Sequence, residues 1–193
     1  MALDRLIEAI RCKDNPTVAG LDPRLEYLPD YLIKKAFAEY GETLEGAAAA
    51  IEAYNRELID ALADVVPAVK PQAAYYELYG WPGMRALSRT IAYAREKGLF
   101  VITDGKRNDI GSTMEAYAAA HLGETEVGSR SFEAFGGDAL TVNGYLGADG
   151  IRPLLEICRQ KDKGLFVLVK TSNPSSGELQ DRLLDSGETL YRR

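Results

Sequence analysis

The chain has 193 residues, of which 46% are hydrophobic and 27% are charged, so it is long enough to bury a full core as one globular domain. Its net charge of -6, without a basic cluster, argues against nucleic acid as a partner. No apolar run is long enough for a membrane span and the N-terminus lacks a signal-peptide pattern, so we expect a cytoplasmic protein. Cys12 and Cys158 have no metal-type spacing and are predicted to be buried thiols.

Helical and strand periodicities alternate along the chain. Helices are predicted at residues 3–12, 30–40, 43–63, between the turn at 80–83 and Lys97-Gly98, at 110–121, 129–135 and 150–161, and from about residue 178. Strands are predicted at residues 17–22, 65–72, 99–103, 139–143 and 165–171. Five short strands separated by helices are typical of a parallel α/β sheet with right-handed crossovers.

Polar side chains fall at the carboxyl ends of these predicted strands. They are Asp22, Lys70, Asp104, Lys106, Asn143, and Thr171 or Ser172. In barrels and in open α/β sheets, ligands bind and chemistry occurs at this edge. The pattern therefore predicts one site assembled from several strand ends.

Asp104 and Lys106 follow the apolar run 99–103 directly. Side chains at i and i+2 of a strand point the same way, so both are predicted to share a face with Phe100 and Ile102. Asp109 lies past the strand, where a helix is predicted to begin, in a position to cap that helix. An acid and a base are thus expected side by side, with a second acid close behind them.

Each of these residues, taken alone, also has an ordinary structural explanation. An acid such as Asp22 after a strand is typical of a turn, Asn143 is a common turn residue, and Lys70 is consistent with a solvated side chain. His121 is the only histidine, which excludes histidine triads and histidine-rich metal sites. It lies on a predicted helix among alanines, where a structural role is favoured.

The segment Asp104-x-Lys106-x-x-Asp109-Ile110-Gly111 resembles the signature of the orotidine 5'-phosphate decarboxylases, in particular their longer bacterial and protozoan branch. Further segments agree with that family in order and spacing: Gly20-Leu21-Asp22-Pro23-Arg24, Lys70-Pro71-Gln72, Asn143-Gly144-Tyr145 and Lys170-Thr171-Ser172-Asn173-Pro174. The central motif also recurs in hexulose-phosphate synthases and ketogulonate-phosphate decarboxylases, but the flanking segments favour the orotidine enzyme.

The resemblance implies a TIM (β/α)8 barrel, of which residues 1–193 supply about the first five strands as a single domain without the C-terminal ones. The late barrel loops of the family grip the substrate phosphate, and no residue of this chain can be assigned that role. We therefore expect the chain to be part of a longer protein. A ligand-binding or inert fragment is the non-enzyme alternative.

The resemblance also implies the chemistry: decarboxylation of orotidine 5'-phosphate to UMP in pyrimidine biosynthesis, without a metal or organic cofactor. Lys70, Asp104, Lys106 and Asp109 would form an alternating charged network, and Lys106 would protonate C6 of the ring. Asp109, with Ile110 and Thr113, would reach the site of the partner in a homodimer. The remaining substrate-binding residues would be Asp22, Gln72, Asn143, Thr171 and Ser172. A sugar-phosphate decarboxylase or aldolase, the alternative enzyme, would need magnesium.

Overall fold

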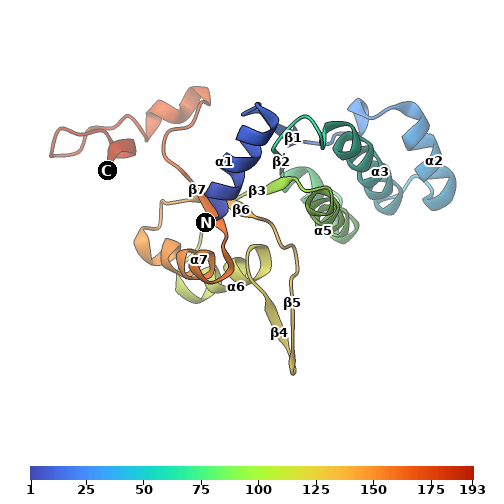
Figure 1. The fold of residues 1–193 in the computed structure, drawn as a ribbon. Coiled ribbons are helices and arrows are strands. Elements are labelled where there is room, and N and C mark those ends of the chain that lie inside the picture. Colours follow the sequence, from blue (N-terminus) through green and yellow to red (C-terminus); the bar gives the residue numbers. More distant parts are fainter.

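A five-stranded parallel sheet, with strand order β1-β2-β3-β6-β7, organises the computed structural model, which describes residues 1–193 (Figure 1). Its strands are β1 (Val18–Leu21), β2 (Ala68–Pro71), β3 (Phe100–Arg107), β6 (Ala139–Asn143) and β7 (Gly164–Leu168). The predicted parallel α/β architecture and its five strands are confirmed.

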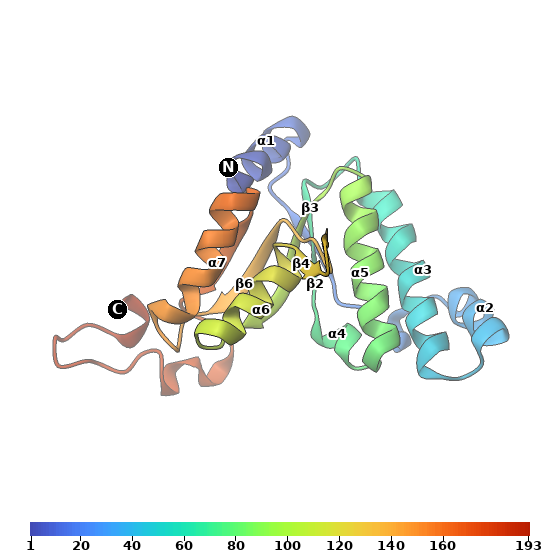
Figure 2. The same ribbon diagram turned by 90° about the horizontal axis from the view of Figure 1, so that it is seen from below.

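Helices connect the strands and lie on both sides of the sheet. They are α1 (Ala2–Lys13), α2 (Asp30–Tyr40), α3 (Leu44–Leu62), α4 (Ala74–Glu77), α5 (Gly80–Glu96), α6 (Gly111–His121) and α7 (Ala148–Lys161), with single 3-10 turns at Leu25–Tyr27, Pro174–Glu178 and Leu190–Arg192. Figure 2 shows α2, α3 and α5 grouped on one side of the central strands and α6 and α7 on the other. None of the helices has the length and apolar character that crossing a membrane requires.

Alternate residues of the strands contribute to different apolar clusters, as the period of two demands. One cluster joins α1 to the sheet and contains Ala2, Leu6, Ala68, Phe100, Ile102 and Ala139. The neighbouring Val69 and Val101 pack with α3 and α5, whereas Leu140 and Val142 pack with α6 and α7. The strands are therefore covered on both faces, as parallel strands usually are.

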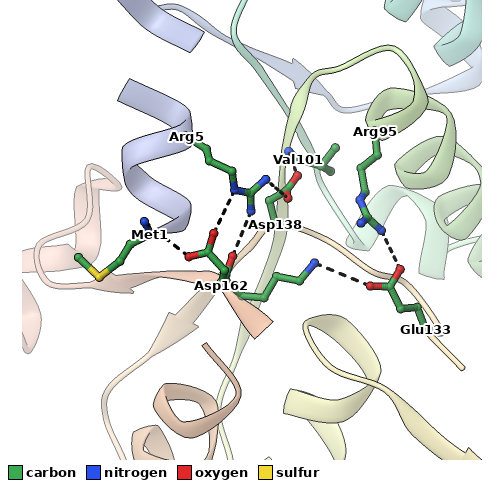
Figure 3. Close-up of polar contacts among 8 residues, drawn as sticks. Met1, Arg5, Arg95, Val101, Glu133, Asp138 and Asp162 are labelled. Atoms are coloured by element: carbon green, nitrogen blue, oxygen red, sulfur yellow. Dashed lines mark hydrogen bonds and ion pairs between the residues drawn. The ribbon is translucent and has the colours of Figure 1, made fainter. Parts of the chain in front are cut away.

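Ion pairs fasten α1 to the amino ends of the strands (Figure 3). The Arg5 guanidinium lies 3.1 Å from an Asp138 carboxylate oxygen and 3.3 Å from Asp162. The other Asp138 oxygen accepts a hydrogen bond of 2.9 Å from Val101 N, at the start of β3. Nearby, Arg95 pairs with Glu133 at 2.8 Å. This charged cluster closes the edge opposite to the predicted site.

Three strand boundaries differ from the predicted ones by more than one residue. β2 begins only at Ala68, because Val65 and Val66 still hydrogen-bond back to Leu62 at the end of α3. β3 continues to Arg107 instead of ending at residue 103. β7 ends at Leu168, three residues earlier than predicted. The last two differences bear directly on the site.

The predicted helix at 129–135 is wrong, because this region forms an antiparallel hairpin of β4 (Thr125–Val127) and β5 (Arg130–Phe132) that projects from the body (Figure 1). Gly128 and Ser129 make its two-residue turn, and Gly128 has a φ of 64°, in the left-handed region that favours glycine. A Gly-X pair between β-forming residues is a recognised hairpin signal.

Two further predictions are corrected. The segment after Glu178 is not an α-helix: it forms an irregular loop that ends in the 3-10 turn at Leu190–Arg192. One isolated bridge joins Leu183 to Thr189 in this loop, and Gly187 adopts a φ of 79°. The Cys12 thiol is exposed rather than buried, since it lies on the solvent side of α1, while Cys158 is half-buried.

Candidate active site

Asp104 stands at the centre of the predicted site and is 5% exposed. Its Oδ2 accepts hydrogen bonds from Lys70 Nζ at 2.6 Å and from Gln72 Nε2 at 3.0 Å. Its Oδ1 accepts from Lys106 Nζ at 2.6 Å and from the Thr141 hydroxyl at 2.8 Å. One buried carboxylate is thus held by four donors from three adjacent strands.

The parallel register of β2 and β3 brings these side chains together. Ala68 pairs with Phe100, and an isolated parallel bridge further along joins Gln72 to Asp104. Asp104 lies four residues after Phe100, so both point to the same face, as predicted. Lys70 lies two residues before Gln72, which places its ammonium on the same side of the sheet.

Lys106 does not continue the regular strand. Its φ is 46°, in the left-handed region that residues other than glycine rarely adopt. Its backbone N–H donates to the Thr141 hydroxyl at 2.9 Å rather than to a strand carbonyl. This local turn directs the Lys106 ammonium back onto Asp104, and such outliers cluster at functional sites.

Opposing effects act on the pKa of Asp104. Burial acts to raise it, but hydrogen bonds from Lys106, Lys70 and Thr141 outweigh burial and hold the pKa of this carboxyl below its usual range. Asp104 is therefore ionised at neutral pH. Two ammonium groups against one carboxylate leave the site locally positive, which suits an anionic ligand.

Asp109 is close in sequence to Asp104 and Lys106, but its side chain contacts neither of them in this chain. Its carboxylate accepts a hydrogen bond from Ile110 N at 2.8 Å and forms no ion pair. The prediction that it caps the following helix is wrong, because the N-cap of α6 is Ile110 and no side-chain cap bond is made. Ile110 and Thr113 are exposed at the start of α6.

The remaining predicted binding residues surround the carboxyl ends of β1, β6 and β7. Asp22 is exposed one residue after β1. Asn143 ends β6 and accepts a hydrogen bond of 2.9 Å from Tyr145 N, as a turn residue does. Thr171 and Ser172 lie beyond β7 rather than at its end. The substrate-binding roles of all four remain predictions.

Two residues of this region were missed from the sequence. The Thr141 hydroxyl contacts both Asp104 and Lys106, and a threonine two residues before the end of an apolar strand was the available signal. The Gln180 side chain holds Thr171 from both sides, through Thr171 N at 2.9 Å and its hydroxyl at 2.7 Å. No local pattern links Gln180 to Thr171, since the contact depends on the fold of the last segment.

A parallel α/β sheet that collects charged side chains at the carboxyl ends of its strands is typical of ligand-binding α/β proteins, the α/β barrels among them. Within that class, the profile described as Orotidine 5'-phosphate decarboxylase / HUMPS family matches residues 30–192. The chain belongs to this family, and its five parallel strands form part of the family's barrel.

Individual proteins agree with this assignment. The chain is 50% identical over 188 residues to the orotidine 5'-phosphate decarboxylase of Rhodopirellula baltica, covering 97% of this chain and 60% of that relative. It is 47% identical over 178 residues to the enzyme of that name from Caldicellulosiruptor saccharolyticus, covering 92% and 58%. A candidate orotidine 5'-phosphate decarboxylase structure from Streptomyces avermitilis superposes with a TM-score of 0.79 at 37% identity, covering 97% and 59%. The chain thus spans about 60% of the length of the relatives it matches.

Proposed function

We propose that the protein, at its natural length, converts orotidine 5'-phosphate to UMP and carbon dioxide. The observation that carries the proposal is the Asp104 carboxylate held between the Lys70 and Lys106 ammonium groups at 2.6 Å each. The names of the similar curated proteins support the choice of substrate. The sugar-phosphate alternative is favoured by no particular feature of the site.

The proposed chemistry needs stabilisation of charge that appears only in the transition state. As the bond between C6 and the carboxylate breaks, carbon dioxide leaves and the electron pair remains at C6. The Lys106 ammonium beside C6 stabilises this pair and then donates the proton that completes UMP. Lys70 balances the Asp104 charge on its far side, which leaves Lys106 free to move toward the substrate.

Asp104 contributes a second effect in this proposal. Beside the substrate carboxylate it repels a like charge, by roughly 4 kcal/mol at about 4 Å and an effective dielectric near 20. That repulsion disappears as carbon dioxide leaves. We assign the larger share of the rate enhancement to Lys106, because stabilisation by a fixed charge acts on the transition state directly.

The proposal includes a homodimer in which each site receives Asp109, Ile110 and Thr113 from the partner. Its support is that Asp109 has no cationic partner within its own chain and that Ile110 is 59% exposed beside it. The cytoplasmic location stays a prediction, which cell fractionation would test.

The function is tested with Lys106→Ala in the protein at its natural length, by following the absorbance of orotidine 5'-phosphate. We expect turnover to fall about 1,000-fold or more, because the variant lacks both the stabilising charge and the proton donor. Lys34→Ala is the matched control, since Lys34 is an exposed lysine on α2 that pairs only with Asp30. Circular dichroism checks that both variants remain folded.

The outcomes separate the alternatives. Undiminished turnover in Lys106→Ala would overturn the mechanism, and loss of wild-type turnover in excess chelator would favour the magnesium-dependent enzymes. Tight binding of the nucleotide without turnover would support a ligand-binding protein. The intact mass of the assayed protein identifies the length of the chain that carries the activity.

A further inference from the structure

Strand β3 bulges opposite a single residue of β6. Thr103 pairs with Leu140 and Arg107 pairs with Val142, so the three residues 104–106 face Thr141 alone. Bulges insert unpaired residues into one strand and re-aim side chains, often beside active sites. Here the bulged segment contains both members of one ion pair of the site, Asp104 and Lys106.

The Thr141 side chain makes the hydrogen bonds that the strand ladder does not make at this point. Its hydroxyl accepts from Lys106 N at 2.9 Å and donates to Asp104 Oδ1 at 2.8 Å. The single hydroxyl proton and one lone pair are therefore both used. Thr141 is 8% exposed, so water does not readily replace either bond.

These bonds constrain the two charged residues differently. The first fixes the backbone of Lys106 where its φ is 46°, which determines the direction in which its side chain leaves the strand. The second fixes the Asp104 oxygen that also accepts from Lys106 Nζ at 2.6 Å. One hydroxyl thus sets both ends of the Lys106-Asp104 ion pair.

We propose that Thr141 is a positioning residue for proton delivery: its hydroxyl holds the β3 bulge so that the Lys106 ammonium is aimed at the reacting carbon. This inference rests on the proposed decarboxylase function. Thr141 itself does not touch the reacting atoms. A misplaced acid slows the reaction more than it weakens substrate binding. We therefore expect loss of the Thr141 hydroxyl to lower mainly kcat.

Thr141→Val removes the hydroxyl at nearly constant volume, whereas Thr141→Ser retains it. We expect Thr141→Val to lower kcat about 10- to 100-fold with KM changed by less than about 3-fold, and Thr141→Ser to keep most of the activity. Thr103→Val is the matched control: Thr103 is fully buried on β3, but its hydroxyl has no hydrogen-bond partner. That variant is expected to keep wild-type kcat.

Backbone hydrogen exchange at Lys106 gives a readout that is independent of turnover. We expect the Lys106 amide to exchange about 10-fold faster or more in Thr141→Val, and at the wild-type rate in Thr141→Ser and Thr103→Val. If Thr141 had only a structural role, Thr141→Val would lower the unfolding temperature without faster exchange confined to the Lys106 amide. If the wild-type protein proves inactive toward orotidine 5'-phosphate, only the proposed function fails. The exchange measurement then still shows whether the Thr141 hydroxyl holds the backbone of Lys106.

Three results would overturn the inference. The first is an unchanged kcat in Thr141→Val, and the second is a loss of kcat with unchanged exchange at Lys106. The third is a serine variant as impaired as the valine variant, because the hydroxyl would then not be the determining group. The serine variant also settles the question if Thr141→Val does not fold.

Discussion

At the scale of single residues, the Asp104 carboxylate is fixed in charge as well as in place. Each of its oxygens accepts two hydrogen bonds, and one donor to each oxygen is an ammonium group. Its pKa lies below the usual range despite burial, which rules out proton uptake by Asp104 near neutral pH. Asp104 therefore acts as a permanent charge, and in the proposed reaction the proton comes from a neighbouring group.

His121 is a second buried ionisable residue whose pKa the fold shifts. It is 3% exposed at the end of α6 and lies between Tyr117 and Phe135, with ring centroids at 6.4 and 4.9 Å. Burial, followed by repulsion from Arg107, lowers its pKa to about 4, while Glu77 acts weakly in the opposite direction. The structural role favoured from the sequence agrees with this packing.

The lowered pKa of His121 predicts acid sensitivity. The folded state favours the neutral ring, so its contribution to stability is complete above the unfolded pKa near 6.5 and is lost as the pH falls toward about 4. Over that range the wild-type protein should lose roughly 3 kcal/mol more unfolding free energy than His121→Phe, measured by urea denaturation. The substitution breaks no bond to Nδ1, which has no partner. Parallel pH profiles for the two proteins would contradict the assignment.

At the scale of elements, the carboxyl ends and the amino ends of the strands have different roles. The carboxyl edge carries the charged network, while the amino edge is closed by α1 and the cluster around Asp138 (Figure 3). Asp138 is 5% exposed and joins the Arg5 side chain to the backbone of β3. In α/β barrels, residues at the carboxyl ends of the strands typically serve function, and residues at the amino ends typically serve stability.

Removing Asp138 should therefore affect stability more than activity. We expect Asp138→Ala to lower the unfolding free energy by about 1 to 3 kcal/mol, because it leaves the buried Val101 N–H without its acceptor and removes one of the two carboxylates that pair with Arg5. Asp185→Ala is the control, since Asp185 is exposed and has no hydrogen bond or ion pair, and its effect should stay within about 0.5 kcal/mol. Urea denaturation at neutral pH measures both variants, and equal stabilities would refute the role of Asp138.

The sequence predicted those elements and contacts that depend on local period and strand order. The helix at 30–40 and the strand at 139–143 are found at the predicted residues, because each has a clear apolar period between polar ends. The grouping of Lys70, Asp104 and Lys106 followed from the rule that carboxyl ends of parallel strands meet. The hairpin at 125–132 was missed because the Gly128-Ser129 signal was outweighed by an apparent helical period.

What escaped prediction depends on pairing between segments far apart in the sequence. The bulge at 104–106 exists only relative to β6, so the role of Thr141 is invisible in either strand alone. Thr171 is likewise held by Gln180, which lies in a segment predicted to be helical. Residues whose partners are set by tertiary contacts were therefore the ones missed.

At the scale of the whole molecule, the proposed dimer predicts complementation between two inactive variants. Lys106→Ala supplies an intact Asp109, and Asp109→Ala supplies an intact Lys106, so each heterodimer contains one complete site. An equal mixture after subunit exchange should regain about a quarter of wild-type turnover, since about half of the dimers are mixed and each has one working site of two. Activity that stays at the level of the separate variants after exchange would refute the shared site.

The order of the strands has a consequence for the way the protein is made. Every residue that contacts Asp104 comes from the adjacent strands β2, β3 and β6 or their ends, within residues 70–141. A chain emerging from the ribosome can therefore bring the two lysines to their counter-ion as soon as these three strands have paired. The carboxylate between the two ammonium groups thereby reduces their mutual repulsion before later parts of the chain dock onto this segment.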